Sequence, residues 1–431
     1  MTASRQPPTA PGGHPGLGHT VPFLREPLGT LTRVGRAREP VVEVTIAGQQ
    51  FCLVTEPALV GQALVTDADA YRKAEIVREN LGTLQGGSLV LLEGEQWRER
   101  RELLGPSFDR TAVEAAAALT TRYTGDAVAD WPTEVRADER TRSLSLSILA
   151  RALFGLDLRG ERTPIHEAAE DILARMDPRT LSAFLPEWAP TPANYRFQRA
   201  VATLHERIDA VVAGADSSPD NLLSVMLVAG LGEEQIRDEL IALLFAGYDS
   251  TATALALTLG LLGDRPAVQR RLRRELTRVL DGATPTPSDL EDLPILDAVV
   301  RESLRLYPPQ YVLLREPTRD LTLGRYELDE GTTVVLSPWV CGRDPRHWEA
   351  PDQFRPERWQ ADRERPDFAY FPYGAGPRRC LGRGLAAQTI RLVVAVVCQR
   401  RRLRLQGGLS VTAGPTLSPG SVRLRAVSDV D

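Results

Sequence analysis

The chain has 431 residues, of which 42% are hydrophobic and 25% are charged, an average balance that excludes a disordered, a collagen-like and a multi-span membrane protein. Its 52 basic and 57 acidic side chains leave a formal net charge of −5, so nucleic acid is not an expected partner. Four cysteines without a C-x-x-C pair and five scattered histidines indicate neither a disulfide framework nor a protein-ligated zinc site, and they fit a reducing, cytoplasmic location.

The N-terminal residues 1–20 are rich in proline and glycine and have no continuous apolar run. They predict an extended arm, and neither a signal peptide nor a membrane anchor is expected. Residues 21–431 contain no internal repeat and no biased linker, so they are expected to form a single large domain.

The hydrophobic pattern predicts a mainly α-helical fold with a minor antiparallel β part. Alternating apolar residues over 41–55 indicate a β-hairpin that turns at Ala47-Gly48. Helical spacing follows, and the predicted helices cover residues 57–65, 94–104, 110–131, 143–154, 164–176, 192–213, 221–229, 233–262, 266–280 and 289–307. Short strands are predicted at residues 321–323, 332–337, 403–405 and 422–426.

The helix predicted over residues 233–262 would be about 45 Å long. Its apolar part is long enough to cross a membrane, but Asp249 lies near its centre, and inserting a charge there costs roughly 2.5–3.5 kcal/mol. We therefore expect a deeply buried helix of a large soluble protein.

The densest cluster of turn-forming residues is the segment 371–386, FPYGAGPRRCLGRGLA, where a helix is predicted to begin near Gly382. Cys380 therefore lies at a helix N-terminus beside Arg378 and Arg379. Free backbone N–H groups, the helix dipole and the guanidinium groups all favour a thiolate there, which is a nucleophile or a metal ligand. The other cysteines are predicted to be small buried side chains: Cys52, Cys341 and Cys398.

This segment resembles the haem-binding loop of the cytochrome P450 superfamily, the haem-thiolate monooxygenases. The resemblance is carried by Tyr373, Gly374, Arg378, Cys380 and Gly382. Tyr373 stands where the family usually has phenylalanine. The resemblance implies the cytochrome P450 fold, haem b as the cofactor and Cys380 as the axial iron ligand, and a thiolate ligand favours O–O cleavage.

Glu302 and Arg305 form an E-x-x-R pattern, which by itself is a common helix-surface ion pair. Their context is an apolar helix ending in LRLYPP, followed downstream by a P-E-R segment that contains Arg358. The resemblance implies that Glu302, Arg305 and Arg358 form a buried structural triad.

Trp97 and Arg101 form a W-x-x-x-R pattern on a predicted helix in the first quarter of the chain. In the resembled family this pair binds a haem propionate. Propionates are carboxylates, so they need donors that keep their charge, and Arg315 and Arg378 also match family positions. The alternative for each arginine is a solvated surface charge.

Residues 246–251 place Ala-Gly-Tyr-Asp-Ser-Thr in the middle of the long apolar helix. Ala246, Asp249 and Ser250 are spaced i, i+3, i+4 and are expected to share one face. A buried acid is costly, so the cluster suggests a site, with a polar patch against a neighbouring helix as the alternative. The resemblance implies haem contact at Ala246 and an acid–alcohol pair for proton delivery, with Asp249 as the acid and either Ser250 or Thr251 as the alcohol.

The resemblance as a whole implies a monomeric haem-dependent monooxygenase that activates dioxygen with two externally supplied electrons and hydroxylates or epoxidises its substrate. No flavin or nicotinamide fingerprint is present, so electrons from NAD(P)H are expected to arrive through a ferredoxin or similar redox protein with its reductase. The alternatives are a peroxide-driven peroxygenase of the same fold and a non-enzymatic haem-thiolate sensor or carrier.

Two further sets of residues are predicted, one from local arginines on the cysteine side and one from family-equivalent positions. An acidic redox partner is expected to dock on a local basic patch of Arg98, Arg100, Arg379 and Arg383. The substrate pocket is expected to contain mostly apolar residues, which suggests a small lipophilic substrate such as a terpenoid or another secondary metabolite. The pocket residues are Leu243, Leu244, Ala246, Gly247, Tyr311, Val312, Leu313 and Leu417.

Overall fold

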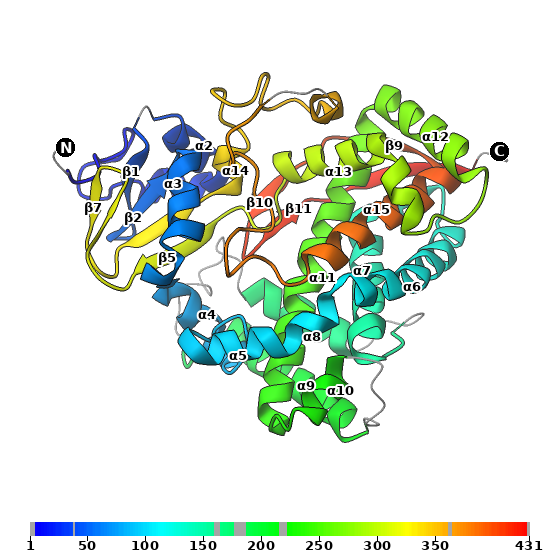
Figure 1. Cartoon of the computed structure of the whole chain (residues 1–431), viewed down its shortest axis with the longest axis horizontal. Helices are drawn as coiled ribbons and strands as arrows, with labels where there is room; N and C mark the ends of the chain where they lie inside the picture. Colours follow the sequence, from blue (N-terminus) through cyan, green and yellow to red (C-terminus); the bar gives the residue numbers. More distant parts are fainter. Residues whose placement is uncertain are drawn as a thin grey trace. The chain divides into compact units, whose positions relative to one another are not determined.

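The computed structural model describes residues 5–37, 39–158, 164–175, 187–214, 222–360 and 364–428. The chain forms two compact units. The first unit comprises Met1–Asn80, Leu304–Arg355 and Ala361–Cys380, and the second comprises Leu81–Ser303, Pro356–Gln360 and Leu381–Asp431. A five-stranded sheet lies in the first unit and the long helices lie in the second (Figure 1).

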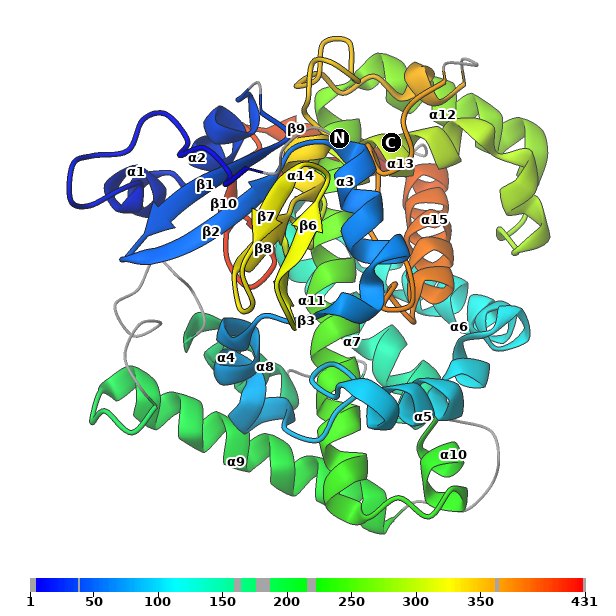
Figure 2. The same cartoon turned by 60° about the vertical axis from the view of Figure 1, so that its left-hand side comes forward.

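The sheet of the first unit has the strand order β1-β2-β8-β5-β3. Figure 2 shows β1 and β2 side by side. Its strands are β1 Val41–Ile46, β2 Gln49–Val54, β8 Thr333–Leu336, β5 Leu313–Pro317 and β3 Tyr71–Lys73. The predicted hairpin is confirmed, since β1 and β2 pair through a turn in which Ala47 and Gly48 have φ of 50° and 80°. β2 and β8 are parallel, so the β part is mixed where we expected only antiparallel pairing.

Short elements cover and extend this sheet. The ribbon β6 Leu321–Leu323 and β7 Tyr326–Leu328 is antiparallel. A turn of π-helix, Gln62–Thr66, directly follows α3, which ends at Gly61. The single helix predicted over residues 57–65 is therefore divided into an α-helical and a π-helical part. The other helices that lie wholly in this unit are α1 Thr20–Arg25, α2 Pro27–Gly35, α3 Pro57–Gly61, a 3₁₀ turn at Ala68–Ala70, and α14 Pro338–Cys341.

The N-terminal segment is tied to the strands of the first unit. Arg5 forms a parallel bridge to Tyr326, and Thr9 forms one to Glu43. Ala10 is 5% exposed. The segment therefore pairs with β7 and β1 at Arg5 and Thr9, and its residues 11–17 are exposed.

The second unit is organised around α11 Glu233–Asp264, a 32-residue helix. Two glutamates occupy its first turn, and Pro266 follows its end, which fits the helix dipole and the loss of a backbone donor at proline. By length and hydropathy alone α11 could cross a bilayer, but 72% of its most apolar stretch is buried. This confirms the predicted core helix.

The remaining helices of the second unit pack around α11 and one another. α7 lies along α11, α15 packs against α6, and α8 packs against α9. Their bounds are α5 Gly94–Leu104, α6 Arg110–Ala129, α7 Ala137–Phe154, α8 Pro164–Arg175, α9 Pro192–Ala213, α10 Leu222–Val228, α12 Pro266–Leu280 and α15 Arg383–Arg400. Single 3₁₀ turns occur at Gly105–Phe108, Ser288–Asp292 and Pro356–Trp359. Two more helices, α4 Glu75–Gln85 and α13 Pro294–Leu306, pass from one unit to the other.

Two small antiparallel groups of strands complete the second unit. β9 Arg401–Gln406 and β4 Glu134–Arg136 flank β12 Arg423–Ser428. The hairpin β10 Val411–Ala413 and β11 Leu417–Pro419 carries Thr416 in its turn.

The mainly helical architecture is confirmed, and several element boundaries differ from the sequence prediction. The helix predicted over residues 289–307 is a 3₁₀ turn followed by α13, because Pro294 begins the helix. The helices α1, α2, α4 and α14 were not predicted. The strands β3, β4, β5, β7, β10 and β11 were not predicted either, since three- to five-residue strands show little periodicity.

Candidate functional site

Cys380 lies in the loop that leads into α15. α15 begins at Arg383 with Gly382 as its N-cap, and the Cys380 N–H donates a hydrogen bond of 2.9 Å to the Tyr373 carbonyl. The Cys380 side chain is exposed, whereas the three other cysteines are buried. Burial raises the pKa of each of these three thiols to about 12. Cys380 is therefore the thiol that can serve as a metal ligand.

Two glycines shape the Cys380 loop. Gly374 and Gly376 have φ of 67° and 66°, a region that favours glycine. A Cβ at Gly376 would lie 1.8 Å from the Leu64 carbonyl oxygen, whereas one at Gly374 would meet only the Leu313 side chain, at 3.6 Å. The sequence analysis named Gly374 and missed Gly376, although its place between Gly374 and Cys380 was visible in the sequence.

The predicted propionate donors lie in both units. Arg315 on β5 is 8% exposed and donates to the Leu314 carbonyl at 2.9 Å, and Arg378 lies two residues before Cys380 in the same unit. In the second unit, the Arg101 guanidinium lies 5.7 Å from the centre of the Trp97 ring, one turn away on α5. A thiol and permanently charged arginines match the chemistry of an iron porphyrin, which needs an axial ligand and donors for two carboxylates.

The acid of the predicted acid–alcohol pair is buried. Asp249 is 4% exposed, Thr416 Oγ1 donates a hydrogen bond to its Oδ2, and Arg142 Nε lies 3.9 Å from its Oδ1. Burial raises the pKa of Asp249 above its usual range, although the Thr416 hydrogen bond and the Arg142 charge oppose this shift. The sequence analysis missed Arg142 and Thr416, which lie far from Asp249 along the chain and belong to no motif.

The alcohol side of α11 has a different environment. Ser250 Oγ donates to the Ala246 carbonyl at 2.7 Å, Ala246 is exposed and Ser250 is partly exposed. Thr251 is 8% exposed. The expectation that Ala246, Asp249 and Ser250 share one face is therefore only partly right, because the Asp249 carboxyl turns to Arg142 and Thr416.

The residues of the predicted structural triad make polar contacts within their own units. In the second unit, Glu302 accepts hydrogen bonds from Arg358 Nε at 2.9 Å and from Trp359 Nε1 at 2.8 Å. In the first unit, Arg305 donates to the carbonyls of Gly342 and Pro351 at 2.6 and 2.7 Å. The three predicted residues are all buried. Each of them pairs with a backbone carbonyl or a charged group that would otherwise lack a hydrogen-bond partner in the interior.

The residues predicted for the substrate pocket differ in exposure. Leu244, Tyr311 and Leu417 are buried, at 2%, 8% and 0% exposure. Ala246 is exposed, and four others are partly exposed: Leu243, Gly247, Val312 and Leu313.

One of the predicted basic-patch residues has another role. Arg100 Nη1 lies 2.7 Å from Glu239 Oε1, and the side chains of this ion pair are 10% and 0% exposed. Arg100 is therefore an interior partner of α11, while Arg98, Arg379 and Arg383 are exposed.

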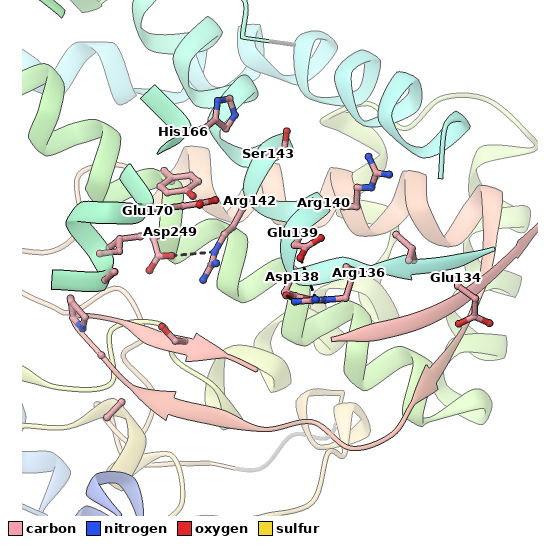
Figure 3. A pocket seen from close by; sticks show the side chains of 18 of the residues that line it. Glu134, Arg136, Asp138, Glu139, Arg140, Arg142, Ser143, His166, Glu170 and Asp249 are labelled. Carbon is pink, nitrogen blue, oxygen red and sulfur yellow. Dashed lines mark hydrogen bonds and ion pairs between the residues drawn. The ribbon is translucent and has the colours of Figure 1, made fainter. Parts of the chain in front are cut away.

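A cavity of about 810 Å³ lies within the second unit, and Asp249 lines it (Figure 3). Its walls come from α7, α8, α11, β4 and the β10–β11 hairpin. Its acidic, basic and histidine lining residues are Glu134, Arg136, Asp138, Glu139, Arg140, Arg142, His166, Glu170 and Asp249. The predicted substrate-contact residues are not among those that line it.

A sequence model of the cytochrome P450 family matches residues 7–414. The chain is 32% identical to cyclooctat-9-en-7-ol 5-monooxygenase of Streptomyces melanosporofaciens, covering 92% of this chain and 89% of that protein. It is 30% identical to cyclooctatin synthase of the same organism, covering 100% and 98%. It is 28% identical to pentalenene oxygenase of Streptomyces avermitilis, covering 97% and 96%.

Solved structures agree with these matches. A six-coordinate cytochrome P450 from Thermus thermophilus has a TM-score of 0.75 at 30% identity and covers 93% of this chain and 98% of that one. The haem domain of cytochrome P450DA has a TM-score of 0.88 at 24% identity, covers 99% and 98%, and shows the shared fold. Together with the family match over nearly the whole sequence, these relatives show that the chain belongs to the cytochrome P450 family and is a P450 monooxygenase.

Proposed function

We propose that this P450 monooxygenase hydroxylates or epoxidises a small lipophilic terpenoid. Three relatives that match it over most of its length are cyclooctat-9-en-7-ol 5-monooxygenase, cyclooctatin synthase and pentalenene oxygenase. The partly exposed apolar residues Leu243, Gly247, Val312 and Leu313 suit a ligand with little polar surface. The proposal rests on two observations together. The thiol of Cys380 is exposed, and the chain is similar to the terpenoid-modifying relatives named above.

Haem b is proposed to bind through Cys380 Sγ. Arg101, Arg315 and Arg378, with the Trp97 indole N–H, are proposed to hold its two propionates by charge-assisted hydrogen bonds. When bound, the haem supplies dioxygen activation, which a thiolate ligand favours. The buried Arg315 stays charged because a guanidinium does not lose its proton in proteins.

We propose that Asp249 is the acid and Ser250 the alcohol of the pair that delivers protons. Burial raises the pKa of Asp249, so its carboxyl can hold a proton closer to neutral pH than an exposed aspartate can. Ser250 is favoured over Thr251 because Ser250 is partly exposed beside Ala246, whereas Thr251 is buried. Electrons are proposed to pass from NAD(P)H through a reductase and a ferredoxin or similar redox protein.

A reduced carbon monoxide difference spectrum tests the thiolate ligand. The unaltered protein is expected to show the haem-thiolate band, Cys380→Ala is expected to lose it, and Cys52→Ala is expected to keep it because Cys52 is buried in β2. A band that survives in Cys380→Ala would contradict the ligand assignment.

A binding screen with cyclic terpenes and matched non-terpenoid lipids tests the substrate class. Terpenes are expected to displace water near the haem and change its absorption spectrum, and a reconstituted ferredoxin–reductase system is expected to give oxidised product. No response to any terpene, or full turnover with hydrogen peroxide alone, would contradict the proposal.

A further inference from the structure

The three-stranded sheet of the second unit, β4-β12-β9, carries arginines on its outer face. On its inner face, Leu403, Leu424 and Ala426 are at most 4% exposed. Successive side chains of a strand point to opposite faces, and the residues that alternate with the buried ones are exposed. They share one face, because Arg404 lies directly opposite Arg425. We call this set the arginine face, and it consists of Arg402, Arg404, Arg423 and Arg425.

The arginine face concentrates like charge without compensation. Directly opposed side chains of an antiparallel pair have Cβ atoms about 4.5–5.5 Å apart, and like charges in such a pair are destabilising. Among the residues that the structure describes, Arg404, Arg423 and Arg425 form no ion pair. Arg423 Nε donates to the Ser421 hydroxyl at 3.3 Å, which leaves its charge unbalanced. The opposition of Arg404 and Arg425 therefore costs the fold stability.

Protection of a sheet edge does not account for this face. Charged side chains on an edge strand prevent pairing with other chains, and β9, with Arg402 and Arg404, is an edge strand. β12 is the central strand, flanked by β4 and β9, so Arg423 and Arg425 have no edge to protect. An external anionic group bound to the face would account for all four side chains.

A carboxylate borders the arginines. Glu134 of β4 lies opposite Arg425 on its other side. Glu134 is exposed, and within the described part of the chain it forms no ion pair. The row across the three strands is therefore one carboxylate followed by two guanidinium groups. A matching occupant offers acceptors to the arginines and a cation to Glu134. A protein surface carries both kinds of group, whereas the backbone of a nucleic acid offers only acceptors.

The composition of the sheet also disfavours a membrane surface as the occupant. Peripheral membrane-binding elements combine basic residues with apolar side chains that enter the lipid. In the described part of the chain, the large exposed apolar side chains all lie outside these strands: Leu17, Leu24, Val65, Trp188, Tyr195 and Val228.

The spacing of the arginines fits an acidic helix. Guanidinium groups bind carboxylates in a planar, two-pronged geometry. Glutamates four residues apart on a helix have Cβ atoms about 5–6 Å apart, which matches the separation of directly opposed residues such as Arg404 and Arg425. One turn of such a helix can therefore meet both guanidinium groups.

We propose that the arginine face binds an acidic helix of another protein and that Glu134 receives a basic residue at the end of that helix. The arginine face includes none of the arginines predicted to dock the redox partner, and binding there does not require terpenoid oxidation. Figure 3 shows Glu134 and Asp249 at opposite ends of the cavity, so the binding surface is distinct from the surroundings of Asp249.

The first experiment measures binding of a helical peptide to the holoenzyme. The peptide carries glutamates four residues apart and a lysine at one end. Its affinity is expected to fall as ionic strength rises. Arg404→Gln/Arg425→Gln is expected to bind it roughly fivefold more weakly, as for two lost surface ion pairs.

A matched variant controls for net charge. Arg196→Gln/Arg199→Gln removes two exposed arginines of α9 and is expected to bind the peptide like the unaltered protein. Equal losses in the two double variants, or no binding by the unaltered protein, would overturn the proposal.

The second experiment tests Glu134 with a copy of the peptide in which glutamine replaces the lysine. The unaltered protein is expected to bind the lysine peptide more tightly, and Glu134→Gln is expected to bind the two peptides equally. A preference that survives in Glu134→Gln would overturn the role of Glu134.

Two further probes test the class of partner. They are vesicles of phosphatidylglycerol and phosphatidylcholine in equal parts, and a short DNA duplex. Both are expected to bind more weakly than the lysine peptide. Tighter binding of either probe, lost in Arg404→Gln/Arg425→Gln, would overturn the choice of a protein partner.

Thermal unfolding distinguishes binding from a role in folding. Arg404→Gln removes the repulsion with Arg425, so its Tm is expected to equal or exceed that of the unaltered protein. A marked fall in Tm would show that the fold itself requires Arg404 and would overturn the proposal.

Discussion

The carboxyl of Glu239 shows what burial does to a single charge. Glu239 is 0% exposed on α11. Its Oε1 accepts a hydrogen bond from the Leu89 N–H at 2.6 Å and pairs with Arg100 at 2.7 Å. Burial nevertheless raises the pKa of Glu239 to about 7, since loss of hydration outweighs both contacts. The folded protein therefore binds a proton at Glu239 that the unfolded chain releases near pH 4.5.

This difference predicts a pH-dependent stability. The contribution of Glu239 is fully present below about pH 4.5 and is lost as the pH rises to about 7, a loss of about 3 kcal/mol. Relative to the unaltered protein, Glu239→Gln is expected to gain stability progressively over this pH range in denaturant unfolding. Glu234→Gln, whose glutamate is 83% exposed on the same helix, is the control. Parallel pH profiles for the unaltered protein and Glu239→Gln would contradict the assignment.

At the scale of an element, the loop before α15 depends on one glycine more than on its neighbours. Gly376 combines a φ of 66° with a close approach to the Leu64 carbonyl, which leaves no room for a Cβ. Gly374 shares the conformation, but a Cβ there would make an ordinary contact. Packing against the Leu64 backbone within the first unit therefore constrains the loop at Gly376.

Gly376→Ala is therefore expected to displace the Cys380 loop. We expect a loss of about 1–3 kcal/mol in the free energy of unfolding, as for an overpacked site, and a weakened haem-thiolate band. At Gly105 an added Cβ would meet no neighbouring atom within 4 Å. Gly105→Ala is therefore expected to leave both measurements unchanged. Equal results for the two variants would show that the Leu64 approach does not constrain the loop.

At the scale of the whole molecule, charge sets the conditions for docking a redox partner. The net charge of −5 repels an acidic protein, so docking of the proposed ferredoxin would require local arginines. Arg98, Arg379 and Arg383 are exposed, whereas Arg100 is engaged with Glu239. Association that depends on such arginines weakens as salt screens the charges.

The rate of reduction by an acidic ferredoxin is accordingly expected to fall as ionic strength rises. Arg379→Gln is expected to flatten this dependence, and Arg270→Gln, an exposed arginine of α12, is expected to leave it unchanged. A rate that increases with salt would mean that net repulsion dominates and that local arginines do not guide docking.

The order of residues along the chain was enough to predict the helical architecture, the β1–β2 hairpin and the family, because hydrophobic period and short motifs are local properties. It also singled out Cys380, since a thiol beside arginines at a helix N-terminus is visible in a ten-residue window. Several other short strands, such as β3, β5, β10 and β11, and the parallel β2–β8 pair were not predicted, because pairing depends on residues far apart in sequence.

The groups that surround each motif residue became visible only in the folded chain. Thr416 lies 167 residues from Asp249, and no pattern in either segment links them. The same applies to Glu239 and Arg100, 139 residues apart, an ion pair that removes one arginine from the predicted basic patch. A motif identifies a residue type and a spacing. Burial, charge pairing and the direction of a side chain arise from packing between distant segments, and these properties set the direction in which the pKa of an acid such as Asp249 is shifted.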